Sequence, residues 1–451
     1  MIGARAHFSP RDTIFAPASG GGRAAIAVLR LSGPACAAAL EALAPGARFP
    51  DRVATLRLLR DPVTLEALDR ALVIRFLAPR SFTGEEMAEL HVTGGRAVIA
   101  GIVGALAKIP GLRPAEPGEF AWRAFENGKL DLSEVEGLAD LVEAETAAQR
   151  RQALRIAGGA LSRETEGIRS KLLEAMAILE AQIDFSDVED ADALSLDAAR
   201  AIVAEAARRV RAALAGAEAG ARLREGFNVV IAGPPNVGKS TLMNALARRD
   251  VSIVSAIPGT TRDLVEVALE LRGYPVTLVD TAGIRETEDP IEREGVARAR
   301  RRAEEADLTL WLSDAEEPVD APPPGGGPTI VVLTKADRRP GNRICRESAG
   351  AAIRISALTG AGIAQLLDAV ANLAEERMAG PAPALITLER HRAAFADALG
   401  ALERALDPSA QELELVAEDL RLAARALERI AGRIDVEEVL GDIFSRLCVG
   451  K

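Results

Sequence analysis

One segment constrains the fold of this chain more than any other: Gly233-Pro-Pro-Asn-Val-Gly-Lys-Ser240. It follows the apolar run Phe227–Ala232, which is typical of a buried strand, and it leads into the helical pattern of Lys239–Arg248. A glycine, four residues and Gly-Lys-Ser between a strand and a helix form the pattern of a phosphate-binding loop. Lys239 can neutralise phosphate charge there, and the Ser240 hydroxyl can coordinate Mg²⁺. A chance glycine loop is the alternative, and its flanking elements argue against it.

The segment around this loop alternates strand and helix patterns from residue 227 to residue 375. Such alternation predicts a mainly parallel, doubly wound sheet. We place the boundaries of this Ras-like α/β domain at residues 223–376. The expected strands and helices after the loop are Leu264–Leu271, Val276–Val279, Glu292–Glu305, Leu308–Leu312, Ile330–Leu333, Ile353–Ile355 and Ile363–Leu373.

Two further motifs follow strands of this domain. Asp280-Thr-Ala-Gly283 places a carboxylate at a strand end, where a metal ion next to the phosphates would lie. Thr334-Lys-Ala-Asp337 can set the Asp337 carboxylate against the N–H donors of a guanine edge, which adenine lacks, and Ser356-Ala-Leu358 would complete the base pocket. The usual motif has Asn where Thr334 stands, so we predict weaker nucleotide binding with the preference for guanine retained.

The catalytic group is harder to locate. Ras-type enzymes orient the attacking water with a Gln after Asp-x-x-Gly, but this chain has Ile284 there. Catalysis must come from elsewhere, and the acidic segment Ile284–Arg293 supplies candidates, most of which are expected to be solvated surface charges. The loop Ser255–Asp263 occupies the place of a switch loop, with Thr261 as a candidate Mg²⁺ ligand, although Pro258-Gly259 alone would indicate only a turn.

Composition limits the other possibilities. The formal net charge is −11 and aromatic residues make up 3% of the chain, which disfavours a general attraction to nucleic acid and an aromatic RNA-stacking surface. The three cysteines are far apart in sequence, so neither a disulfide framework nor a zinc motif is expected. No signal peptide and no apolar run long enough for a membrane span are evident, which predicts a cytoplasmic protein.

The remainder of the 451 residues indicates two more domains. Residues 1–127 mix helices with short strand-like runs, which predicts an α+β domain. The expected strands are Ala25–Leu31, Val53–Leu59, Ala71–Leu77 and Ala88–Val92. Residues 128–222 and 377–451 carry helical apolar periodicity on both sides of the α/β domain. We expect these two segments to form one discontinuous helical domain with the α/β domain inserted, and two separate bundles are the alternative.

The motifs together resemble one family across nearly the whole chain. The phosphate loop, Pro258-Gly-Thr-Thr-Arg-Asp263, Asp280-Thr-Ala-Gly283 and the terminal Cys448-Val-Gly-Lys451 are similar to those of the MnmE (TrmE) family of tRNA-modification GTPases. The N-terminal stretches that agree with it are Gly22–Gly33, Ser81–Glu85, Pro117–Phe120 and Asn127–Leu132. The resemblance implies an N-terminal folate-binding domain that forms a homodimer, a discontinuous helical domain and an inserted GTPase domain.

The resemblance also implies an activity. Members of this family are K⁺-dependent GTPases that act with the flavoprotein MnmG, in a heterotetramer, on certain tRNAs. They add an aminomethyl or carboxymethylaminomethyl group to C5 of the wobble uridine, with 5-formyl-tetrahydrofolate or 5,10-methylene-tetrahydrofolate as the one-carbon donor. GTP hydrolysis drives their conformational cycle.

Several residues match functional positions of the family. Asn236, Ser255, Ile257 and Thr260 match its K⁺ site, where the cation would take the role of an arginine finger. Glu292 matches the glutamate that positions the attacking water, which would resolve the problem posed by Ile284. The expected GTP-binding positions are Asn236, Val237, Gly238, Lys239, Ser240, Thr241, Ser255, Ala256, Ile257, Pro258, Gly259, Thr260, Thr261, Asp280, Thr281, Ala282, Gly283, Thr334, Lys335, Ala336, Asp337, Ser356, Ala357 and Leu358.

A second set matches the family's folate site: Arg30, Glu89, Lys129 and Lys451. An arginine, an acid and two lysines can hold a pterin and its glutamate tail, whereas each alone would be taken for a surface charge. Cys448 matches the family's C-terminal cysteine, with a reactive thiol and a buried inert thiol as alternatives. The chain departs from the family in the stretch His91-Val-Thr-Gly-Gly95.

Two other functions remain open on sequence grounds. Ribosome-assembly GTPases share the phosphate loop and switch sequences, but they carry a basic RNA-binding module that neither flank of this chain resembles. A folate-dependent transferase with a regulatory GTPase domain would need no flavoprotein.

Overall fold

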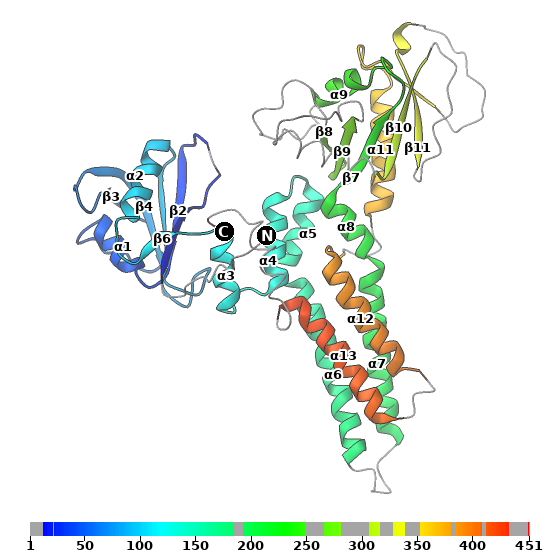
Figure 1. Ribbon diagram of the computed structural model, residues 1–451, viewed down its shortest axis with the longest axis horizontal. Helices are drawn as coiled ribbons and strands as arrows, with labels where there is room; N and C mark the ends of the chain where they lie inside the picture. The colour runs from blue at the N-terminus through cyan, green and yellow to red at the C-terminus, as the bar shows by residue number, and fades with distance from the viewer. Residues whose placement is uncertain are drawn as a thin grey trace, which may run out of the picture. The chain divides into compact units, whose positions relative to one another are not determined.

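The structure is a computed structural model that describes residues 12–20, 22–184, 193–248, 266–280, 306–315, 328–338, 352–379, 384–407, 412–432 and 450. The chain divides into two compact units. The first comprises Met1–Ala139, Ala157–Glu166 and Arg425–Lys451, and the second comprises Asp140–Ile156 and Gly167–Ala424. Figure 1 shows the elements of both. Within the described residues, no helix combines the length and the apolar character needed to cross a membrane.

The first unit contains a six-stranded sheet with the order β3-β4-β5-β2-β1-β6. Neighbouring strands are antiparallel, except that β6 runs parallel to β1. The strands are β1 (Thr13–Pro17), β2 (Ile26–Ser32), β3 (Thr55–Arg60), β4 (Ala67–Phe76), β5 (Met87–Thr93) and β6 (Leu112–Pro114).

One face of this sheet is buried. Leu29 and Leu31 of β2 join Leu40 of α1 (Cys36–Leu43) and Ile102 of α2 (Arg96–Leu106) in a shared core. Side chains alternate along a strand, so Arg30 lies on the opposite, half-buried face. The sheet is followed by α3 (Glu119–Glu126) and α4 (Leu132–Glu143). The sequence prediction of an N-terminal α+β domain is confirmed.

Helices flank the α/β segment on both sides in sequence. They are α5 (Ala147–Ala157), α6 (Ala160–Asp184), α7 (Ala193–Ala215) and α8 (Ala217–Glu225) before it, and α12 (Glu389–Ala405) and α13 (Leu413–Ala431) after it. Ion pairs join the two sets: Arg211 of α7 with Glu403 of α12 at 2.7 Å, and Arg421 of α13 with Glu180 of α6 at 2.9 Å. The two segments therefore form one discontinuous helical domain, as predicted, and not two separate bundles.

The inserted domain has a second six-stranded sheet, with the order β12-β11-β10-β7-β9-β8. All neighbours are parallel except the hairpin of β8 (Glu266–Leu271) and β9 (Tyr274–Asp280). Its turn residues Arg272 and Gly273 have φ of +53° and +88°, as a tight hairpin with right-handed twist requires. The parallel strands are β7 (Phe227–Ala232), β9, β10 (Leu308–Asp314), β11 (Thr329–Thr334) and β12 (Ile353–Arg354).

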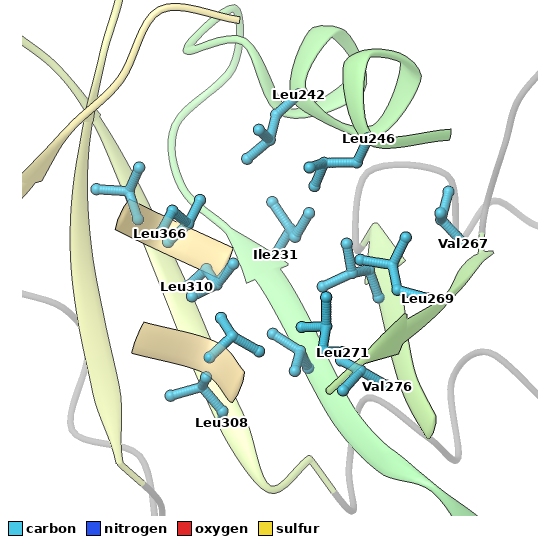
Figure 2. Packing of buried hydrophobic residues seen from close by; sticks show 14 of the residues in the cluster. Ile231, Leu242, Leu246, Val267, Leu269, Leu271, Val276, Leu308, Leu310 and Leu366 are labelled. Atoms are coloured by element: carbon cyan, nitrogen blue, oxygen red, sulfur yellow. The ribbon is translucent and has the colours of Figure 1, made fainter. Parts of the chain in front are cut away.

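The core of the inserted domain lies between this sheet and its helices. Leu242 and Leu246 of α9 (Lys239–Ala247) and Leu366 of α11 (Ile363–Met378) belong to the same buried cluster as Ile231 and Leu310 (Figure 2). Strands buried on both faces explain the continuous apolar runs in the sequence. The doubly wound fold is confirmed. The predicted phosphate-binding and base-binding motifs lie at the edge of the sheet where the parallel strands end.

Some elements differ from the sequence expectations. β1 was not expected, and neither was β6, which has three residues and shows little periodicity of its own. β4 begins at Ala67 and not at Ala71, because pairing with β3 extends it across a polar stretch. The expected helix Glu292–Glu305 and the periodic residues from Ile434 to Leu447 lie outside the described residues.

Candidate functional site

The phosphate loop has the backbone that its sequence predicts. Gly233 follows β7 with a φ of +147°, and a Cβ atom there would lie 2.4 Å from the Leu312 carbonyl oxygen, so only glycine fits. Asn236 and Gly238 also have positive φ, of +61° and +106°, and α9 begins at the next residue. This places the N-terminus of a helix directly behind the loop, which favours an anion there.

Lys239 and Asp280 carry the charge at this loop. The Lys239 ammonium donates to the carbonyl oxygens of Gly233 at 2.8 Å and Pro234 at 2.9 Å, and the residue is only 9% exposed. Asp280, at the end of β9, is 2% exposed and accepts a hydrogen bond from the Ser240 hydroxyl at 3.3 Å. A hydroxyl and a carboxylate side by side are oxygen donors of the kind that Mg²⁺ prefers.

The base-side motifs meet at the same edge of the sheet. Thr334 ends β11, and the ammonium of Lys335 lies 2.7 Å from Oδ2 of Asp314 at the end of β10. A hydrogen bond from Ser356 holds the pKa of the Asp337 carboxyl below its ordinary value, so the exposed carboxylate is ionised and can only accept hydrogen bonds. This arrangement suits a base with N–H donors.

The second set of predicted residues lies on the N-terminal sheet. Arg30 of β2 and Glu89 of β5 are direct cross-strand partners, and the guanidinium donates to Glu89 Oε1 at 3.0 and 3.3 Å. The guanidinium also lies over the rings of Phe82 and Phe120, at 5.3 and 5.9 Å from their centroids. A further hydrogen bond, of 3.4 Å, reaches the carbonyl oxygen of Gly450.

Lys129 approaches the same loop as Phe82. A Cβ atom built on Gly84 would lie 3.2 Å from Lys129 Cε, so the lysine stem packs directly over this glycine. The structure thus gathers Arg30, Glu89 and Lys129 around the loop of residues 81–85. His91 is a neighbour that sequence reasoning did not assign: its Nε2 lies 3.4 Å from Glu89 Oε2.

A buried ionic network lies under this loop, and sequence reasoning missed it. The network centres on Arg123 of α3, which is 1% exposed and contacts Glu85 at 3.0 Å and Glu119 at 3.1 Å. Glu119, fully buried, also accepts from Arg113 at 2.6 and 2.8 Å. Ser32 donates to Glu85 at 2.7 Å. The stretches Ser81–Glu85 and Pro117–Phe120 were noticed only as family signatures.

Many predicted site residues lie outside the described part of the chain. Described are Asn236–Thr241, Asp280, Thr334–Asp337, Ser356–Leu358, Arg30, Glu89 and Lys129. Outside it are Ser255, Ala256, Ile257, Pro258, Gly259, Thr260, Thr261, Thr281, Ala282, Gly283, Glu292, Cys448 and Lys451. In the part that is described, no group of three or more His, Cys, Asp and Glu side chains could by itself hold a metal ion.

Comparisons with known proteins show the family to which the chain is related. The N-terminal family model, described as GTP-binding protein TrmE N-terminus, matches residues 13–129, and the MnmE helical domain model matches residues 132–448. The tRNA modification GTPase MnmE of Beijerinckia indica is 53% identical over 99% of this chain and 97% of its own length. That of a Methylobacterium species is 54% identical over 98% of this chain and 100% of its own.

Among solved structures, the G domain of the T. maritima FeoB iron transporter is 25% identical. It covers 33% of this chain and 98% of its own, with a TM-score of 0.23, too low to support a conclusion by itself. The two MnmE relatives are more than 50% identical to this chain over nearly its whole length. This similarity favours tRNA modification over ribosome assembly. The chain belongs to the MnmE family of tRNA modification GTPases.

Proposed function

We propose that this GTPase binds GTP between the phosphate loop and Asp337, at the edge of the sheet where the parallel strands end. Hydrolysis there drives modification of the wobble uridine at C5. The observation that carries the proposal is the convergence of Lys239, Asp280 and Asp337 on one edge of the sheet. In a parallel sheet this edge is where ligands bind. The Lys239 ammonium now donates to two loop carbonyl oxygens, and phosphate oxygens would replace them as stronger acceptors.

Two cations belong to this proposal. Ser240, which lies beside Asp280, would hold Mg²⁺ together with Thr261. The K⁺ ligands would be Asn236, Ser255, Ile257 and Thr260. When bound, these ions neutralise the negative charge that develops on the phosphate oxygens. The Ser240 hydroxyl next to Asp280 and the left-handed backbone of Asn236 support these assignments. Glu292 is proposed to position the attacking water.

Arg30, Glu89, Lys129 and Lys451 are proposed to hold a reduced folate, either 5-formyl- or 5,10-methylene-tetrahydrofolate, as the one-carbon donor. The support is the half-buried Arg30–Glu89 pair with two aromatic rings beside it, which offers both polar groups and an apolar surface to a flat ring system. Cys448 is proposed to lie near this site. The chain would act in the cytoplasm as a homodimer through its N-terminal domain, with the flavoprotein MnmG and tRNA as partners.

The experiment is nucleoside mass spectrometry of tRNA from the source cell with this gene deleted and then restored. We expect the deletion to remove a 5-aminomethyl-type wobble uridine and the wild-type gene to restore it. Glu292→Ala should fail to restore it while GTP binding stays nearly intact, and Glu288→Ala, from the same acidic segment, is the matched control that should restore it.

Two outcomes would contradict this proposal. An unchanged nucleoside profile in the deletion strain would separate the GTPase from the modification, and restoration by Glu292→Ala would remove the catalytic assignment.

Hydrolysis rates in K⁺ and Na⁺ at equal ionic strength test the proposed K⁺ site. Equal rates in the two salts would rule that site out.

A further inference from the structure

Thr334 stands where the base-recognition motif usually has asparagine, and the structure shows what its side chain does. The residue is 5% exposed at the end of β11. Its hydroxyl lies 2.7 Å from the carbonyl oxygen of Val237 in the phosphate loop and 3.2 Å from that of Ser313 in β10. One buried hydroxyl therefore joins the base-binding segment, the phosphate loop and the neighbouring strand.

The backbone of Thr334 takes part in the same junction. Its carbonyl oxygen accepts from the Ala315 N–H at 3.1 Å, and Thr334 is in register with Asp314. The next residue, Lys335, has a φ of +57° and contacts Asp314 at 2.7 Å. The position of Thr334 is thus fixed by main-chain pairing, and its side chain transmits that position to the phosphate loop.

A hydroxyl has one hydrogen to donate. At 2.7 Å from Val237, that hydrogen is used inside the protein, and the methyl group of Thr334 cannot form a hydrogen bond. Asn at this position would have a second polar group to offer. Base discrimination in this chain must then come from Asp337, whose carboxylate the Ser356 hydroxyl orients.

We propose that Thr334 is a positioning residue that ties the phosphate loop to the base-binding edge of the sheet and makes no hydrogen bond to the nucleotide. The proposal rests on the nucleotide site described above. It leaves the sequence-based prediction of weaker binding with a retained preference for guanine in place, and it assigns the Thr334 hydroxyl to the phosphate loop.

The test compares Thr334→Val, which has nearly the same shape without the hydroxyl, with Thr334→Ser, which keeps the hydroxyl. Dissociation constants of the full-length protein are measured for GDP, GMP and inosine diphosphate. Losing the donor to buried carbonyl oxygens should weaken GDP binding by Thr334→Val about tenfold or more, whereas Thr334→Ser should stay within about threefold of wild type.

Two ratios of affinities, GDP to inosine diphosphate and GDP to GMP, distinguish a positioning role of Thr334 from a direct contact with the base and from a general loss of structure. The preference for GDP over inosine diphosphate should not change in Thr334→Val, because the lost bond does not reach the base. The loss should be greater for GDP than for GMP, because the displaced loop binds the outer phosphate. A general loss of structure would lower the affinities for GDP and GMP equally. The fluorescence of Trp311 in β10 reports whether the domain remains folded.

The proposal is overturned if Thr334→Val binds GDP as wild type does, if it changes the base preference, or if it weakens GDP and GMP equally. It is also overturned if Thr334→Ser loses about tenfold in affinity, a result that counts even if the valine variant does not fold. Failure of the wild type to bind any guanine nucleotide would instead refute the nucleotide site itself.

Discussion

The nucleotide site and the N-terminal site hold their charged groups in different ways. At the phosphate loop, Lys239 is held by two carbonyl oxygens that lie five and six residues away in sequence. At the N-terminal site, Arg30 is held by Glu89, 59 residues away, and by Gly450, 420 residues away. Lys239 is thus held by local backbone geometry, whereas Arg30 is held by groups that only the finished fold brings together.

This difference predicts how each site tolerates change. A group held by backbone can be replaced with little effect on the fold, because the loop around it keeps its hydrogen bonds. A group in a buried ionic network cannot be replaced so easily, because its removal leaves the charge of its partner buried and unpaired. Substitution of an exposed group that faces the nucleotide, such as Asp337, should therefore change ligand preference. Substitution within the buried network around Arg123, beneath the N-terminal site, should change stability.

The largest effect is expected from Asp337→Asn at the nucleotide site. The amide offers a donor where the carboxylate only accepts, so the preference for guanosine over xanthosine triphosphate should reverse, by roughly a hundredfold or more. Competition binding measures this, and the Trp311 unfolding transition should not move. An unchanged preference would show that Asp337 does not contact the base.

Arg123→Met at the N-terminal site should produce the largest loss of stability. Glu119, which is fully buried, and Glu85 would each lose a partner, at a cost of about 3–5 kcal/mol. Trp122, the adjacent residue in α3, reports urea unfolding in a Trp311→Phe background. GTP hydrolysis should continue at concentrations of urea below the transition. A loss under about 1 kcal/mol would show that this network does not hold the site together.

Arg113→Met should produce a smaller loss that depends on pH. Burial raises the pKa of Glu119, but hydrogen bonds from Arg113 and the neighbouring backbone outweigh it, so the pKa lies below its ordinary value. In the wild type this stabilisation is present above the unfolded-state pKa and is lost as pH falls through the folded-state pKa. Without Arg113 the pKa rises, so a deficit of about 1–3 kcal/mol at neutral pH should shrink on acidification.

Lys108→Met is the matched control for this charge loss. The hydrogen bond from Lys108 lowers the pKa of Asp61 to about 2, so any deficit of the control should persist down to the ordinary pKa of aspartate and shrink only below it. The Trp122 transition between pH 7 and pH 4 distinguishes the two variants. A deficit of Arg113→Met that does not vary over that range would contradict the assigned role of Glu119.

The smallest effect is expected away from both sites, from Arg421→Met on the helical domain. Arg421 pairs with Glu180 and Glu418, but all three side chains are about half exposed, and such pairs contribute little. Thermal unfolding followed by circular dichroism should coincide with wild type at low and at high salt. A loss as large as that of Arg123→Met would mean that burial is not what separates strong from weak ion pairs in this chain.

The same contrast explains what the sequence could predict. The loop of residues 233–240 combines strand, turn and helix signals within one short window, so fold and chemistry could be predicted together. Arg123 could not be assigned, because nothing local distinguishes a buried arginine in α3 from a solvated one. Arg30 and Glu89 were assigned only through family resemblance, since their pairing depends on the register of β2 with β5.

Thr334 shows a limit of another kind. The motif predicts weaker binding from the groups that the Thr334 side chain can offer to a ligand, and a motif alone does not show which groups of the protein that side chain contacts. The bond to Val237 depends on where the phosphate loop passes in space, 97 residues away in sequence. Likewise β6 was missed because it exists only by pairing with β1.

The contact between Arg30 and Gly450 sets an order of events during synthesis. A Cβ atom at Gly450 would lie 2.3 Å from the carbonyl oxygen of Pro17, so this part of the C-terminal segment fits closely against the first strand of the chain. Ribosomes add about 5–20 residues per second, so Arg30 waits roughly 20–80 s for this partner. The residues of the nucleotide site are all synthesised before Gly450, whereas a product that terminates early would lack this contact and leave the N-terminal site incomplete.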